Sequence, residues 1–187
     1  MIVLASASPR RLELLESAGW IVECDPSGAV EVEFGLDTPA GLAMANARLK
    51  WGAVAHRHAG VVLSADTVVW MEGKSYGKPA DRLEARRMLT ELSGATHEVV
   101  TGVKVGIFGD RVVEFHVSSR VTFQAVDEAF ICDYVERINP LDKAAGYAAQ
   151  GDNGRLISRI EGPLSNVIGL PIEKVQEILS AEFGLSV

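Results

Sequence analysis

The chain has 187 residues, of which 48% are hydrophobic and 23% charged, and this composition is typical of a soluble globular domain. Its net charge of −7 argues against a broad nucleic-acid-binding surface, which requires a basic face. No apolar run is long enough to span a membrane, and no basic stretch precedes the first apolar residues, so we expect neither a membrane helix nor a signal peptide. Cys24 and Cys132 are far apart, which is typical of free thiols in a reducing compartment.

The first predicted elements are a short buried strand, a serine-rich turn and a helix. Residues 2–4 are apolar, Pro9 suits the first position of a helix, and Ser8 is placed to cap that helix. Gly19 suits the position just after the end of the helix. Such a turn directs free backbone N–H groups and the positive end of the helix outward.

The same turn has the chemistry of an anion site. Ser6 and Ser8 provide hydroxyl groups, and Arg10 and Arg11 provide cations, which together suit a polyphosphate. The glycines of a Walker A loop are absent, so a phosphate site here would depend on the arginines. The pattern also fits a capped helix with two solvated arginines.

A buried strand with a carboxylate in its middle follows later in the chain. Residues 20–24 predict a strand, residues 29–37 an acidic loop, and residues 38–57 a helix that begins at Thr38-Pro39. Residues 61–70 are the most apolar run, which predicts a central strand buried on both faces. Asp66 lies within this run, where a carboxylate needs a cation, a metal or several donors, unless it caps a neighbouring turn.

Strands and helices are mixed in the second half of the chain. They are a hairpin turn at 72–73, a helix at 81–92, a hairpin at 99–121, a helix at 127–137, a strand at 156–160 and a helix from 171 to about 183. Neither a repeat nor a low-complexity linker interrupts the chain, so residues 1–187 are expected to form one domain. The fold class predicted is α/β or α+β, with a mixed twisted sheet, flanking helices and two lobes around a cleft.

Several polar side chains in apolar or restricted contexts could serve one polyphosphate site. They are Ser6, Ser8, Arg10, Arg11, Glu31, Lys50, Asp66, Lys78, Lys143 and Gln150. The cations would bind phosphate oxygens and stabilise a leaving group, and the carboxylates would hold Mg²⁺ or position a water. Taken alone, each lysine is more often an ordinary solvated charge than part of a binding site.

At six places the sequence resembles the Maf family, also called septum formation inhibitor Maf proteins, which are nucleoside triphosphate pyrophosphatases. The matching segments occur in the family's order: Ala5-Ser6-Ala7-Ser8-Pro9-Arg10-Arg11, Ala65-Asp66-Thr67, Gly77-Lys78-Pro79, residues 92–99, residues 142–151 and residues 166–171. The resemblance covers nearly the whole chain. It implies a Maf/ITPase-like fold, a cytoplasmic enzyme, a homodimer and a divalent metal cation, Mg²⁺ or Mn²⁺.

The resemblance also implies roles for individual residues. Asp66 matches the proposed proton acceptor, and Lys50 and Lys78 match other catalytic positions. The phosphate-binding turn is matched by Ser6, Ser8 and Arg11. Glu31 and Asp66 fall at the metal-binding positions, although Val30 replaces the first residue of the usual acidic pair, so Glu33 competes with Glu31 for this role.

Three positions distinguish the subgroups of the family, and here they are Arg10, Thr67 and Gln150. This set resembles the subgroup that hydrolyses dTTP and UTP to the monophosphate and pyrophosphate and removes unwanted nucleotides, modified pyrimidine nucleotides among them. The amide of Gln150 can offer a donor and an acceptor to a pyrimidine edge. The alternatives are a 7-methyl-GTP pyrophosphatase of the same family and a nucleotide-binding regulator of cell division without turnover.

Overall fold

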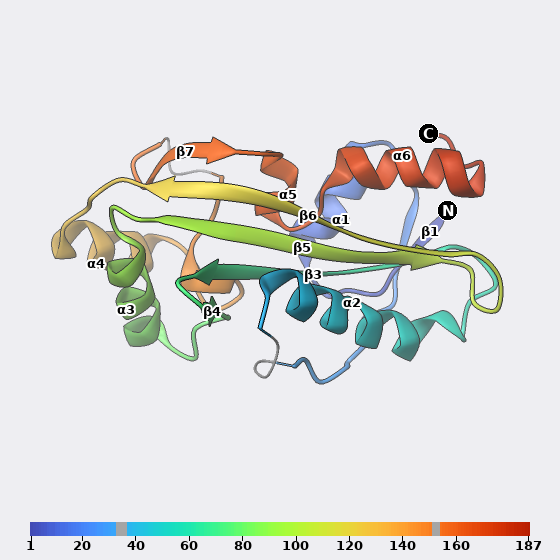
Figure 1. The fold of residues 1–187 in the computed structure, drawn as a ribbon, viewed down its shortest axis with the longest axis horizontal. Helices are drawn as coiled ribbons and strands as arrows, with labels where there is room; N and C mark the ends of the chain where they lie inside the picture. The colour runs from blue at the N-terminus through green and yellow to red at the C-terminus, as the bar shows by residue number, and fades with distance from the viewer. Residues whose placement is uncertain (33–36, 151–153) are drawn as a thin grey trace.

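The computed structural model describes residues 1–32, 37–150 and 154–187. Within these ranges seven strands form one mixed sheet in the order β2-β1-β3-β5-β6-β7, with β4 paired to β3. β1 (Ile2–Leu4) runs parallel to β2 (Val22–Cys24) and to β3 (Val62–Met71), and the other strand pairs are antiparallel. A mixed sheet with flanking helices is therefore confirmed (Figure 1).

The remaining elements follow the predicted order closely. They are α1 (Pro9–Ser17), α2 (Pro39–Ala55), β4 (Lys74–Tyr76), α3 (Arg82–Leu92), β5 (Thr96–Gly106), β6 (Val112–Phe123), α4 (Glu128–Arg137), the 3₁₀ turn η1 (Ala144–Gly146), β7 (Ile157–Glu161), α5 (Leu164–Ile168) and α6 (Ile172–Phe183). Among the described α-helices, only the short α5 lacks a counterpart among the predicted helices. Pro163 stands at its N-cap and has no side-chain oxygen with which to signal a helix start.

The predicted helix caps are confirmed except at α1. Thr38, Asp81 and Asp127 each accept a backbone N–H at the start of their helices, over 3.1, 2.8 and 2.8 Å. Ser8 occupies the N-cap position of α1, but its hydroxyl caps no backbone N–H of the described chain, so that prediction is wrong. The backbone N–H of Ser8 instead donates to Oγ of Ser6 (3.2 Å), which leaves the Ser8 hydroxyl able to bind a ligand.

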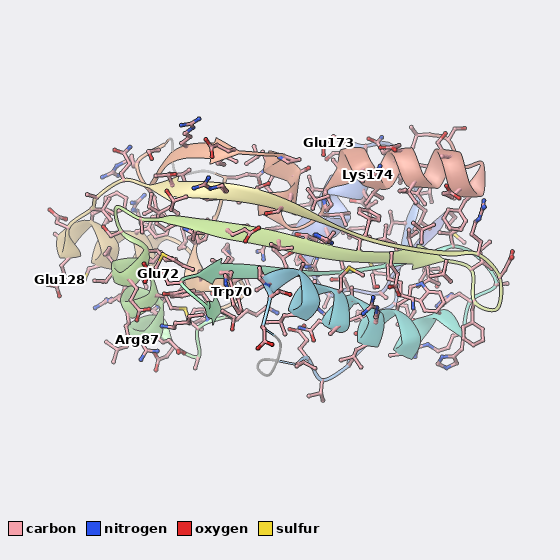
Figure 2. All side chains as sticks on the ribbon, in the orientation of Figure 1. Trp70, Glu72, Arg87, Glu128, Glu173 and Lys174 are labelled. Atoms are coloured by element: carbon pink, nitrogen blue, oxygen red, sulfur yellow. The ribbon has the colours of Figure 1, made fainter. Side chains whose placement is uncertain are left out.

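Buried apolar side chains form two large clusters, around helices that lie toward opposite ends of the sheet in Figure 1. One cluster packs around α3 and α4, and the other packs around α1 and α6. The long strands β3 and β5 contribute to both clusters, so one sheet connects the two predicted lobes. Glu173, labelled in Figure 2 at the start of α6, accepts a hydrogen bond from Ser165 (2.5 Å) and ties α6 to α5.

An interruption in the pairing of β3 opens a site in the middle of the sheet. β5 pairs with β3 from Val62 to Trp70, so β1 and β4 must share the opposite edge of β3. On that edge β1 pairs only with residues 62–63 and β4 only with residues 69–71. Residues 64–68 of β3 thus have no neighbouring strand there within the described chain, and this stretch contains Asp66 and Thr67.

Helix α2 lies directly against the sheet at Gly102 of β5, which is paired with Asp66 of β3. A Cβ atom at Gly102 would lie 2.6 Å from the carbonyl carbon of Ala43 and 2.7 Å from the backbone nitrogen of Met44. Any side chain larger than hydrogen would push α2 outward. The absence of a side chain at Gly102 therefore brings α2 close to Asp66.

His97 on β5 is buried between the aromatic rings of Phe123 and Tyr147. Its Nε2 lies 2.9 Å from the hydroxyl of Tyr147, and its ring meets that of Phe123 edge-on at 4.8 Å. Its Nδ1 has no hydrogen-bond partner among the described residues. Burial lowers the pKa of His97 from 6.5 to about 4, because a charged imidazolium would lose its hydration there.

We expect the stability of the protein to fall as the pH drops from about 6.5 to 4. In that interval the unfolded chain protonates this imidazole and the folded chain does not, so protons favour unfolding. The shift corresponds to about 3 kcal/mol at the acid end. Denaturant unfolding of His97→Gln across this interval should show a flatter pH dependence. The exposed His116→Gln variant serves as the control, and equal slopes for the two variants would contradict the assignment.

None of the described helices is both long enough and apolar enough to cross a bilayer.

Candidate active site

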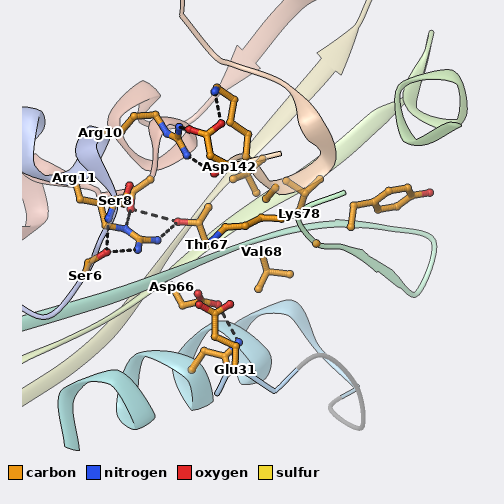
Figure 3. Close-up of a pocket in the computed structure, with 18 of the residues that line it drawn as sticks. Ser6, Ser8, Arg10, Arg11, Glu31, Asp66, Thr67, Val68, Lys78 and Asp142 are labelled. Atoms are coloured by element: carbon orange, nitrogen blue, oxygen red, sulfur yellow. Dashed lines mark hydrogen bonds and ion pairs between the residues drawn. The ribbon is translucent and has the colours of Figure 1, made fainter. Parts of the chain in front are cut away.

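A pocket of about 860 Å³ opens where β3 lacks a neighbour, and both lobes contribute to its walls. The predicted site residues that the structure describes all line it: Ser6, Ser8, Arg10, Arg11, Glu31, Lys50, Asp66, Thr67, Lys78, Lys143 and Gln150. Glu33, the competing metal ligand, lies outside the described residues. The described side chains that were predicted from the sequence as site residues therefore lie around one pocket (Figure 3).

Arg11 forms the buried part of the wall between β1 and α1. Its Nη1 donates to Oγ of Ser6 (3.0 Å), its Nη2 to Oγ1 of Thr67 (3.1 Å) and its Nε to the carbonyl oxygen of Gly169 (2.8 Å). Gly169 has a φ of 136°, which favours glycine and lets its carbonyl face the guanidinium. An arginine has more N–H groups than these three bonds use, so Arg11 can hold this wall and still donate into the pocket.

Thr67 joins this wall to β5 and α5. Its hydroxyl lies 2.9 Å from that of Thr101 and 3.3 Å from the carbonyl oxygen of Gly169. Thr101 in turn donates to the carbonyl oxygen of Asn166 over 3.1 Å. The described bonds of the Thr67 hydroxyl thus connect it to protein groups on three elements, although its side chain also borders the pocket.

On the opposite side, two carboxylates meet one lysine from α2. Lys50 Nζ lies 2.6 Å from Oδ1 of Asp66 and 2.8 Å from Oε1 of Glu31. The side chains of Lys50 and Asp66 are each 9% exposed, whereas that of Glu31 is 42% exposed. Figure 3 shows Glu31 and Asp66 side by side over α2. The cation that Asp66 requires in a buried strand is therefore Lys50, and the alternative of a turn cap is wrong.

Asn46 completes this group and was not predicted as a site residue. Its Nδ2 donates to Oδ2 of Asp66 (3.1 Å) and to the carbonyl oxygen of Val32 (3.0 Å), and its Oδ1 accepts the N–H of Val32 (2.7 Å). Asn46 therefore holds Asp66 and the segment next to Glu31 together. The signal was present in the sequence, because Asn46 precedes Lys50 by one helical turn and faces the same side.

Positive charges surround the carboxylates of the pocket. Desolvation by itself would raise the pKa of Glu31, but Lys50, Lys78 and Arg11 outweigh it and lower that pKa below its ordinary range. Burial lowers the pKa of Arg11, against the opposing effect of Asp66 and Glu31. Glu31 is thus held in its ionised form, and Lys78 contributes from the loop that follows β4.

Arg10 points away from Arg11 and meets the far wall of the pocket (Figure 3). Its Nη1 donates to Oδ2 of Asp142 and its Nη2 to the carbonyl oxygen of the same residue, both over 2.9 Å. Lys143 donates to Oδ1 of Asp142 over 2.6 Å. Gln150 is exposed and borders the pocket from the same segment. The two adjacent arginines therefore have different partners.

A family model described as Maf-like protein matches residues 1–182 of the chain. The chain belongs to this family. Relatives named dTTP/UTP pyrophosphatase, from Bacillus anthracis and from Bacillus mycoides (strain KBAB4), are each 42% identical over 175 residues, which cover 93% of this chain and 91% of the relative. The Maf resemblance of the sequence is thus confirmed.

The fold of this Maf protein also matches a solved structure. A HAM1 protein from Coxiella burnetii is 16% identical, with a TM-score of 0.51 and coverage of 96% of this chain and 98% of that chain. At this level of identity the match concerns the fold alone. It agrees with the predicted mixed sheet and flanking helices.

The carboxylates of this Maf protein suit a hard divalent cation in part. Glu31 and Asp66 both present oxygens at the Lys50 ammonium, and carboxylate oxygens are the ligands that Mg²⁺ and Mn²⁺ prefer. In the described part of the chain, no group of three or more His, Cys, Asp or Glu side chains is arranged to hold a metal. Phosphate oxygens and water would have to supply the remaining ligands, as is usual for Mg²⁺ in nucleotide sites.

Proposed function

We propose that this protein is a nucleoside triphosphate pyrophosphatase that hydrolyses dTTP and UTP between the α and β phosphates. The observation that carries the proposal is one pocket in which a serine–arginine turn faces a buried Asp66–Lys50 pair. The first group suits a polyphosphate and the second suits activation of a water. The relatives named dTTP/UTP pyrophosphatase support both the reaction and the substrate.

The residues of the pocket have different roles in the proposed reaction. The hydroxyls of Ser6 and Ser8 and the remaining N–H groups of Arg11 bind phosphate oxygens. The ammonium groups of Lys50 and Lys78 stabilise negative charge that develops on the pyrophosphate as the bond breaks. Asp66, held by Lys50 and Asn46, orients the attacking water and accepts its proton.

Glu31 and Asp66 would hold a divalent cation in this reaction. When bound, such a cation lowers the pKa of the attacking water and neutralises phosphate charge. Lys50 then needs a new anionic partner, and the phosphates of the substrate can provide it.

We expect removal of divalent cations to abolish turnover. Protein dialysed against a chelator should release no pyrophosphate from dTTP or UTP, and addition of Mg²⁺ or Mn²⁺ should restore it. The measurement is a pyrophosphate assay with the metals titrated back singly. Full activity in the chelator would contradict the proposed role of Glu31 and Asp66 in metal binding.

A side-by-side substrate panel tests the proposed function. Purified protein with Mg²⁺ is incubated with dTTP, UTP, a 5-substituted pyrimidine triphosphate, GTP and 7-methyl-GTP, and both products are measured. We expect the monophosphate and pyrophosphate in equal amounts, with the highest kcat/KM for the pyrimidine nucleotides. Release of orthophosphate instead, or preferential turnover of 7-methyl-GTP, would overturn the proposal as stated.

A further inference from the structure

An ion pair links the phosphate-binding turn to the wall of the pocket that begins at Asp142. Arg10 lies in the first turn of α1, and both terminal nitrogens of its guanidinium contact Asp142 over 2.9 Å. One of these bonds reaches the side chain and the other reaches the backbone. Arg10 therefore fixes the course of the chain at Asp142 as well as the position of its carboxylate.

Asp142 is held firmly on its own side of the pocket. Lys143 Nζ donates to its second carboxylate oxygen (2.6 Å) and to the carbonyl oxygen of Asn139 (2.7 Å). Three residues further on, the backbone N–H of Ala145 donates to the carbonyl oxygen of Gly77 (2.9 Å), next to Lys78. A displacement of Asp142 would thus be transmitted both to η1 and to the loop that carries Lys78.

The wall that follows Asp142 differs chemically from the rest of the pocket. Residues 144–150 contribute Ala144, Tyr147, Ala148, Ala149 and Gln150 to the lining, and none of these side chains is charged. The described cations and carboxylates of the phosphate side lie on α1, the segment that precedes α2, α2, β3 and the loop after β4. An uncharged surface with one amide suits a nucleobase and does not suit phosphates.

From this arrangement we infer that Asp142 is a specificity-determining positioning residue. Through Arg10 it sets the distance between the phosphate-binding turn and the uncharged wall at 144–150. That distance determines the space available for the nucleobase of the substrate. This inference rests on the proposed function. With the pair intact, a pyrimidine spans that distance and the larger purine is excluded. With the pair broken, the wall moves outward, and the preference for pyrimidines declines.

The test compares the ratio of kcat/KM for UTP to that for GTP in four variants. Asp142→Asn, Arg10→Gln and the double variant should each lower the ratio by about tenfold, the typical effect of losing one charged hydrogen bond. The double variant should be no worse than either single variant, because both changes break the same link. The matched control is Asp133→Asn, which breaks an exposed pair with Arg137 on α4 and should leave the ratio unchanged.

The outcomes separate this inference from the proposed function. An unchanged ratio in Asp142→Asn, or additive losses in the double variant, would overturn the role of Asp142 while wild-type turnover of UTP still stood. Absence of wild-type turnover would overturn the proposed function instead. In that case the preference is measured by binding. The Kd values of UTP and GTP analogues with a non-hydrolysable α,β bridge are compared in the same variants. If Asp142→Asn does not fold, Arg10→Gln breaks the pair from the other side, and the same comparison decides.

Discussion

Replacement of Asp66 with asparagine is expected to lower the turnover of dTTP and UTP by about a thousandfold, the scale of a lost general base. An amide cannot accept the proton of the attacking water, but its oxygen can still accept a hydrogen bond from Lys50, which now lies 2.6 Å from Oδ1. The variant should therefore fold and bind nucleotide. Steady-state kinetics and the Kd for dTTP, measured on the same preparation, separate the two effects.

The control for this experiment is Asp110→Asn, in the exposed turn between β5 and β6. Its turnover should equal that of the wild type. The pair of variants also tests the regulator hypothesis, because a protein that only binds nucleotide would keep its cellular effect in Asp66→Asn. Turnover within tenfold of the wild type in that variant would rule out Asp66 as the base.

Replacement of Arg11 with lysine is expected to lower the free energy of unfolding by about 3 kcal/mol and turnover by about a hundredfold. An ammonium group cannot reproduce the planar fork that contacts Ser6, Thr67 and Gly169. The buried groups left unpaired account for the loss of stability, and the missing donors toward the phosphates account for the loss of rate. Urea unfolding and steady-state kinetics provide the two measurements.

Arg82→Lys is the matched control for stability. Arg82 forms an exposed ion pair with Glu136, and such pairs contribute about 1 kcal/mol or less. Its unfolding curve should nearly coincide with that of the wild type. If Arg11→Lys were as stable as Arg82→Lys, the bonds of Arg11 would not hold the wall between β1 and α1.

Local patterns were sufficient to predict most elements of the fold. The apolar run at 61–70, the caps at Thr38 and Asp127 and the two hairpins depend on neighbouring residues, and the structure confirms them. The order of the strands could not be obtained in the same way. The pairing of β3 with both β1 and β4 on one edge depends on contacts between distant parts of the chain.

The site was predictable in composition but not in pairing. The residues converge as predicted, since buried charges need partners, yet the sequence did not show that Asp66 would share Lys50 with Glu31. Nor did it distinguish the partners of two adjacent arginines, because consecutive residues of a helix point in different directions. Asn46 and Asp142 were overlooked as contacts, since their roles appear only once distant segments are placed side by side.

The close approach of α2 to Gly102 separates the parts of this enzyme that can change from those that cannot. The helix approaches the sheet there through backbone atoms, so this contact limits how closely α2, which carries Lys50, approaches the strand that carries Asp66. A residue larger than glycine at position 102 would displace Lys50 from Asp66. The uncharged wall at residues 144–150, by contrast, is positioned through the Arg10–Asp142 pair. New substrate preferences can therefore evolve at that wall while the reaction itself stays the same.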